Sequence, residues 1–132
     1  MKKCMKIIFC MLPLFATSCA FDLVHVKQIP TKINCTKSKK PSFILHDNIK
    51  IGIGTGYSTT LYQDTKWEYV GTITEGDVYK TRDQIVTVEG SNIFEAYIVI
   101  SNNRIVGFYL PVERSYCPID EPINMKIQIL KE

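Results

Sequence analysis

The stretch Ile93–Leu110, IFEAYIVISNNRIVGFYL, decides the fold class of this chain. Its first half, Ile93–Ser101, carries apolar side chains on both of its alternating faces, which is typical of a strand buried in the middle of a sheet. Asn102 and Asn103 follow, and asparagine tolerates a positive φ better than other residues with a Cβ, so the pair predicts a type I′ turn. We therefore expect Ile93–Ser101 to pair with Ile105–Leu110 in an antiparallel hairpin.

Short β-rich runs separated by turn residues extend outward from this hairpin in both directions. Their close spacing, with no helical stretch between them, predicts an all-β fold and argues against βαβ units. We expect a small antiparallel sandwich or barrel of about seven to nine short strands. The remaining expected strands are Ser42–His46, Ile49–Ile53, Tyr57–Tyr62, Lys66–Thr74, Val78–Thr81, Gln84–Glu89 and Ile123–Leu130.

Alternation within two of these runs predicts which side chains form the core. The expected core residues are Trp67, Tyr69, Gly71 and Ile73 in the fourth run and Ile123, Met125, Ile127 and Ile129 in the last. The stretch Pro111–Pro122 contains three prolines and is expected to be the one long irregular connection.

The first 18 residues have the composition of a secretory signal. Lys2, Lys3 and Lys6 precede an apolar stretch, Ile7–Ala16, which is too short to span a bilayer as a stable helix. Small residues follow at 17–20. We therefore divide the chain into a signal peptide (1–18), a tether (19–41) and a single all-β domain (42–132).

The site of cleavage decides the role of Cys19. The sequence before it, FATS, resembles the bacterial lipoprotein box, in which the cysteine is acylated and becomes the mature N-terminus. The alternative is ordinary cleavage after Ala20, because Ser18-Cys19-Ala20 has the small-x-small form that signal peptidase reads. We favour lipidation of Cys19 and an outer-membrane protein that faces the periplasm; cleavage after Ala20 would give a soluble periplasmic or secreted protein.

Removal of the signal changes the charge of the chain. The signal takes three lysines from the 16 basic residues, which leaves 13 against 13 acidic residues. The mature chain is therefore neutral, and its only local basic excess is Lys37, Lys39 and Lys40 in the tether. Such a chain lacks the basic stripe of a nucleic-acid-binding protein.

The cysteines divide in the same way. Cys4 and Cys10 leave with the signal, so Cys35 and Cys117 remain beside Cys19. In an oxidising periplasm such a pair predicts a disulfide. A zinc pair completed by histidines and a redox couple are alternatives, but the sequence has neither a metal-ligand spacing nor a C-x-x-C motif. We expect no metal and no cofactor.

Candidate sites for catalysis are few. The glycine-rich run Gly52–Gly56 lacks the Gly-Lys-Ser/Thr ending of a phosphate loop and is expected to be a tight turn. His25 and His46 are the only histidines, and His46 and Asp47, as sequence neighbours in a strand, point to opposite faces. A hydrolase that uses His46 is therefore the weakest of the functions considered.

The connection near Cys117 is the best candidate for an interaction surface, because binding residues are concentrated on loops held by a rigid scaffold. Tyrosines near predicted turns or strand ends can also present a flat apolar face with a polar tip to a partner, but most of them are expected to be ordinary residues at the edge of the core. They are Tyr57, Tyr62, Tyr79, Tyr109 and Tyr116. We expect the surface to include Glu113, Arg114, Tyr116 and Asp120.

The block from Gly54 to Glu113 resembles a known group of proteins through the segments TGYSTTL, KWEYVGTI, GDVYKT, VTVEG, EAYIVI and GFYLPVE. They are similar to small uncharacterised envelope proteins and lipoproteins of proteobacteria. The resemblance covers about half of the chain and implies a compartment and a domain extent, but no activity.

We therefore expect a cell-envelope lipoprotein that is a non-enzymatic binding or structural module. Its partners would be a membrane, through the lipid, and an envelope protein. The alternative is an inhibitor or immunity protein that blocks a periplasmic enzyme or toxin with the segment from Glu113 to Asp120.

Overall fold

The computed structural model describes residues 25–35 and 39–131. The predicted signal peptide and Cys19 lie outside these residues. The described residues form twelve strands and no helix, which confirms the all-β class. The strands are β1 (Ile29–Pro30), β2 (Phe43–Leu45), β3 (Ile49–Gly52), β4 (Ser58–Leu61), β5 (Lys66–Ile73), β6 (Gly76–Thr81), β7 (Thr87–Glu89), β8 (Ile93–Glu95), β9 (Tyr97–Ser101), β10 (Arg104–Leu110), β11 (Ser115–Asn124) and β12 (Ile127–Ile129).

Eight strands form one antiparallel sheet in the order β1-β11-β10-β9-β6-β5-β2-β12. The predicted hairpin is confirmed for β9, which pairs with β10, and the turn residues Asn102 and Asn103 have φ of 52° and 63°. The first part of the expected strand, Ile93–Glu95, instead forms β8 and pairs with β7 in a separate hairpin. Strand β9 also lies between β10 and β6, as its two apolar faces predict. Ile98 and Val99, adjacent in sequence, are both fully buried on opposite faces of the sheet.

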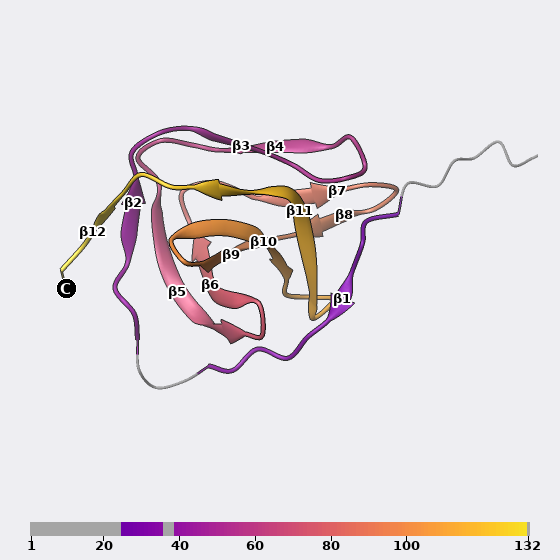
Figure 1. Ribbon diagram of the computed structural model, residues 1–132, viewed down its shortest axis with the longest axis horizontal. Coiled ribbons are helices and arrows are strands. Elements are labelled where there is room, and N and C mark those ends of the chain that lie inside the picture. Colours follow the sequence, from indigo (N-terminus) through magenta and orange to yellow (C-terminus); the bar gives the residue numbers. More distant parts are fainter. Residues whose placement is uncertain (1–24, 36–38, 132) are drawn as a thin grey trace, which may run out of the picture.

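Two hairpins, β3–β4 and β7–β8, lie over one face of the curved sheet and make the molecule a sandwich (Figure 1). The main core lies between these layers, since side chains of both hairpins pack in it with those of the sheet. Its largest fully buried members are Trp67, Phe108, Leu45, Ile51 and Leu61.

A second, smaller core covers the outer face of the sheet and arises from two bulges. The register shifts between Tyr69 and Gly71 in β5, and between Ile105 and Gly107 in β10. Each extra residue reverses the alternation of the side chains that follow it. The expectation that Ile73 shares a face with Trp67 is therefore wrong. The second core consists of Ile73, Val78, Val99, Tyr109 and Tyr116.

Part of the stretch that we expected to be irregular forms β11, the longest strand. Pro118 opposes Gly107 and Ile123 opposes Ile105, so the residues between them bulge out opposite Val106. Proline cannot donate a ladder hydrogen bond and is tolerated at such a bulge. Pro118 and Pro122 therefore mark an interruption within a strand, while Pro111 lies in the turn formed by residues 111–114. At the end of the chain, Ile129 is 59% exposed on the edge strand β12 and is not a core residue.

The described part of the expected tether packs against the domain; we call residues 25–35 the N-terminal strap. Val26 is buried in the main core, and β1 pairs with β11 at the edge of the sheet. The strap then reaches the outer face, where Asn34 and Thr72 exchange two backbone hydrogen bonds of 2.8 and 2.9 Å. Figure 1 shows this path around the edge of the sheet.

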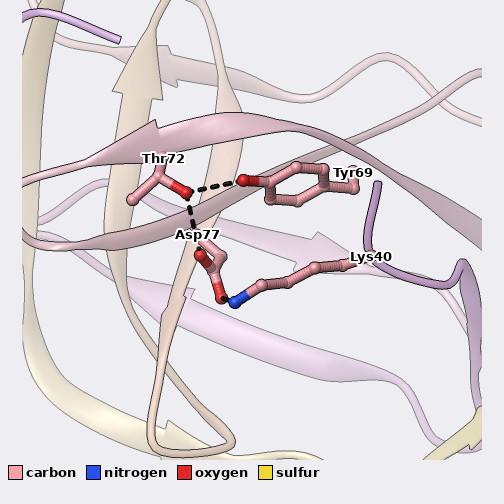
Figure 2. A network of polar contacts seen from close by, with 4 residues as sticks. All are labelled: Lys40, Tyr69, Thr72 and Asp77. Atoms are coloured by element: carbon pink, nitrogen blue, oxygen red, sulfur yellow. Dashed lines mark hydrogen bonds and ion pairs between the residues drawn. The ribbon is translucent and has the colours of Figure 1, made fainter. Parts of the chain in front are cut away.

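A polar network fixes the chain where it returns to the sheet after the strap (Figure 2). Lys40 Nζ lies 2.6 Å from Asp77 Oδ2, and Thr72 Oγ1 donates to the other oxygen of the same carboxylate at 3.1 Å. The Tyr69 hydroxyl is 2.6 Å from Thr72 Oγ1. Because Lys40 is exposed, we regard the network as positioning this segment more than stabilising the fold.

Candidate functional site

The largest cavity described is a groove of about 590 Å³ on the outer face of the sheet. Its volume lies within the range typical of small-molecule sites. One wall is the N-terminal strap, and the floor and other wall are the sheet and the β10–β11 turn. The lining residues are Thr31, Lys32, Ile33, Cys35, Val70, Tyr97, Tyr109, Pro111 and Arg114.

The floor of the groove is apolar and aromatic. Val70, which alternates with Tyr69 in β5, lies on the outer face and packs beside Tyr97 and Ile33 against the second core, and the bulge in β10 places Tyr109 on the same face. The ring centroids of Tyr97 and Tyr109 lie 6.5 Å apart with the planes tilted by 38°. These side chains offer a ligand a hydrophobic surface.

Both tyrosines bring uncharged hydroxyl groups to this surface. Burial raises the pKa of Tyr97, and burial also raises the pKa of Tyr109, which the positive charge of Arg114 partly offsets. Both side chains are therefore neutral phenols at physiological pH. Both residues line the groove, Tyr97 half-buried and Tyr109 only 4% exposed, and neither hydroxyl forms a hydrogen bond with another described residue.

The rim of the groove is basic. Arg114 lies in the β10–β11 turn with φ of 54°, a left-handed conformation that is rare for a residue with a Cβ. The N–H of Thr31 donates to its carbonyl oxygen at 3.1 Å, so the strap and the turn hold each other. Lys32, the next residue of the strap after Thr31, also lines the groove. Within the described residues, neither cation forms an ion pair.

The four residues of the expected interaction surface separate in the structure. Glu113 and Arg114 share the β10–β11 turn, but Glu113 is half-buried, with Oε1 enclosed and without a hydrogen-bond partner. Asp120 is exposed at the second cavity, beyond Pro118. Only Arg114 therefore contributes to the groove.

The prediction that Tyr116 belongs to the interaction surface is wrong, because its side chain is buried. Its hydroxyl donates to the carbonyl oxygen of Val106 at 2.8 Å, and its ring covers Gly107. The alternation of β11 explains the difference: Tyr116 points to the second core and is 7% exposed. It is a structural residue.

Burial raises the pKa of Tyr116 and of Tyr79 to about 12. A folded-state pKa above the unfolded value of about 10 means that the stabilising effect is complete below that pH and is lost as the pH rises towards 12. We expect the denaturant midpoint to fall steeply from pH 9 to 11.5, as measured by circular dichroism. In Tyr116→Phe the denaturant midpoint should decrease less over this pH range, whereas Tyr62→Phe, at an exposed residue, should behave as the wild type. The same pH dependence of the midpoint in both variants would contradict a raised pKa of Tyr116.

A second cavity, of about 410 Å³, lies at the other end of the strap. It brings together His25, Cys117 and Asp120, residue types that serve nucleophilic catalysis in other proteins. Burial, however, raises the pKa of Cys117 to about 11, so its sulfur is a thiol and not the nucleophilic thiolate. We therefore do not favour this cavity as a catalytic site.

The residues considered for phosphate binding, for hydrolysis and for metal binding do not form such sites within the described part of the chain. Gly54–Gly56 form a turn, as predicted, with φ of 90° at Gly56. His46 is exposed after β2, and its backbone N–H donates to the carbonyl oxygen of Lys126. Among the described residues, no three His, Cys, Asp or Glu side chains are grouped so that they could hold a metal ion.

The predicted disulfide is absent, because Cys35 and Cys117 are both free thiols. Cys117 opposes Phe108 and points into the main core, whereas Cys35 lines the groove on the outer face. A disulfide requires Cβ atoms about 3.5–4.5 Å apart, and these two side chains lie on opposite faces of the sheet. Counting cysteines could not reveal this separation.

The two thiols should react at very different rates. In the native protein without reductant, we expect iodoacetamide to label the peptide containing Cys35 quickly and the peptide containing Cys117 only after unfolding, because Cys117 is 1% exposed with a raised pKa. Peptide mass spectrometry measures both. A Cys35–Cys117 disulfide would instead leave both peptides unlabelled until reduction.

Comparison of the chain with protein-family models, with curated proteins and with solved structures found no significant match. Within residues 25–35 and 39–131, no helix combines the length and the apolar character required to cross a bilayer. The case for function therefore depends on the groove and on the sequence.

Sequence reasoning missed the groove because the strap that forms one wall was assigned to a tether. A signal was present: Ile33 and the apolar run Leu23–Ile29 are unusual in a solvated linker. In the sequence, nothing distinguishes Tyr109 from the other tyrosines near strand ends. Its pairing with Tyr97 depends on the register of β9 and β10, which includes a bulge.

Proposed function

We propose that this chain is a non-enzymatic binding module of the cell envelope, with the groove between the strap and the sheet as its recognition site. The observation that carries the proposal is a set of groups at this groove that have no polar partner among the described residues: two tyrosine hydroxyls and two cations beside an apolar floor. Convergence of a few polar groups on an apolar concavity is typical of a ligand site.

The assignment to the envelope is supported by the sequence. A basic segment, a short apolar segment and small residues precede Cys19, which we propose as the site of lipidation. The lipid would hold the protein on the periplasmic side of the outer membrane, and cleavage after Ala20 remains the competing reading. The neutral mature charge supports a partner other than nucleic acid.

The anchor is tested by replacing Cys19. We expect the wild-type protein in the detergent-extracted membrane fraction, and Cys19→Ala either released as soluble protein or retained as an unprocessed precursor. Cys10→Ala, within the proposed signal, is the matched control and should behave as the wild type. Unchanged processing and membrane partition of Cys19→Ala would refute lipidation.

The recognition site is tested by a photoreactive phenylalanine analogue placed at Tyr97, on the floor of the groove, in intact cells. We expect a covalent adduct from this position, because a bound partner would lie against the ring. The control is the same analogue at Tyr62, which is 54% exposed and does not line the groove. Equal adducts at both positions, or none at Tyr97, would contradict the proposed site.

One observation favours the inhibitor alternative. Val112 is 74% exposed in the β10–β11 turn beside Arg114, so the turn presents an apolar tip that a deep enzyme cleft could accept. If this function is correct, a periplasmic hydrolase or toxin should co-purify with the wild type and should be lost in Val112→Asp. Retention of that enzyme by Val112→Asp would exclude the turn as the inhibitory element.

A further inference from the structure

We propose that the groove binds a small apolar carboxylate, whose carboxylate lies at Lys32 and Arg114 and whose apolar body lies on Val70, Tyr97 and Tyr109. This inference rests on the proposed function, since it names the ligand class of the same site. It follows from the charge of the rim, the chemistry of the floor and the way in which the walls are held.

The charge of the groove favours an anion. Among residues 25–35 and 39–131, Lys32 and Arg114 are the charged residues that line it, and no acidic side chain of this part lines it. Two described acids neighbour groove residues: Glu95 in β8, whose negative charge raises the pKa of Tyr97, and Glu113, which precedes Arg114 and has an enclosed Oε1. The planar guanidinium of Arg114 can donate hydrogen bonds to both oxygens of a carboxylate, and Lys32 adds a second positive charge.

The floor favours a ligand that is otherwise apolar. Tyr109 belongs to the second core and Val70, Ile33 and Tyr97 pack against it, so a hydrocarbon or aromatic body can extend that core. The tyrosine hydroxyls supply a few hydrogen bonds near the charged end. A doubly charged phosphate would lose more hydration in such a groove, which is why we favour a carboxylate.

The walls are held before any ligand binds. The strap is joined to the sheet at one end by the hydrogen bond from Thr31 to Arg114 and at the other by the two bonds between Asn34 and Thr72. A ligand therefore needs to order little of the chain, which favours affinity for a small molecule.

The test uses protein purified after expression of the whole chain and three probes of equal chain length: decanoate, decanol and decyltrimethylammonium, each below its micelle-forming concentration. Isothermal titration calorimetry measures the affinities. We expect decanoate to bind at least tenfold more tightly than decanol, and the cation to bind most weakly. Added salt should narrow the difference between decanoate and decanol, because the head-group contact is partly exposed.

Two variants assign the selectivity to the groove. Arg114→Gly should weaken decanoate binding about tenfold and leave decanol unchanged, and the fold should be retained because glycine accepts φ of 54° without strain. Arg104→Gln removes one positive charge from an exposed position at the start of β10. This variant should change neither the affinity for decanoate nor that for decanol. An equal loss in both variants would overturn the proposal, since it would show a non-specific charge effect.

The outcomes separate this inference from the function on which it rests. Equal binding of all three probes would overturn the carboxylate and leave the groove as a site for apolar molecules. No binding of any probe, combined with an adduct at Tyr97 in cells, would overturn the ligand class alone. No binding and no adduct would overturn both proposals.

Discussion

Replacing Trp67 with alanine is expected to lower the free energy of unfolding by about 3–5 kcal/mol, the range measured for large aromatic side chains in protein cores. Trp67 is the one tryptophan of the chain and is fully buried between the sheet and the hairpins. Its Nε1 donates to Thr65 Oγ1 at 2.8 Å, so the polar edge is satisfied as well. Because small domains are stable by only about 5–15 kcal/mol, this variant should be close to unfolded at 37 °C.

The measurement is urea denaturation followed by far-ultraviolet circular dichroism, since Trp67 cannot serve as the fluorescent probe of its own removal. Trp67→Phe retains much of the apolar volume and should lose less stability than Trp67→Ala. Tyr62→Ala, at an exposed aromatic residue, should change stability by less than about 0.5 kcal/mol. A loss below about 1 kcal/mol for Trp67→Ala would contradict the placement of this side chain in the core.

Gly107→Ala should be the most damaging single-methyl substitution that we propose. A Cβ at this position would lie 2.5 Å from the ring of Tyr116, which the hydrogen bond to Val106 holds in place. Overpacking of this kind costs about 1–3 kcal/mol because the backbone or the ring must move. Gly54→Ala is the control, because the nearest atom to its Cβ would be 3.9 Å away.

A double-mutant cycle attributes the effect to the ring. Tyr116→Leu is destabilising by itself, but in that background Gly107→Ala should cost less than in the wild type, because the shorter side chain leaves room for the methyl group. Urea denaturation of the four proteins gives the coupling energy. If Gly107→Ala costs the same in both backgrounds, Tyr116 is not the obstacle.

Much of the fold could be predicted because its signals are local. Alternating apolar residues and the Asn102-Asn103 turn identify the β9–β10 hairpin directly, and the same pattern locates most of the other strands. The bulges could not be predicted in this way. The extra residue is Val70 in β5 and Val106 in β10, and in each case its position depends on how the opposing strand pairs. Each bulge changes the face of every side chain that follows it in the strand.

The candidate site was less predictable because it depends on contacts between residues far apart in the sequence. Lys32 and Arg114 are more than 80 residues apart, and the hydrogen bond from Thr31 brings them to one rim. The cysteines show the reverse case. Cys35 and Cys117 are far apart in the sequence and predict a disulfide only because they are the two cysteines left in the mature chain beside Cys19. In the structure the sheet separates their side chains, and both are free thiols.

The packing of the N-terminal strap limits how far the domain can stand from a membrane. Val26 is already part of the main core, and it lies only seven residues after Cys19. At about 3.3–3.6 Å per extended residue, a chain anchored at Cys19 could hold Val26 no more than roughly 25 Å from the lipid attachment. A tether that ran to residue 41 would have allowed about three times that reach. A protein anchored in this way would bind molecules close to the membrane surface and could not reach molecules deeper in the periplasm.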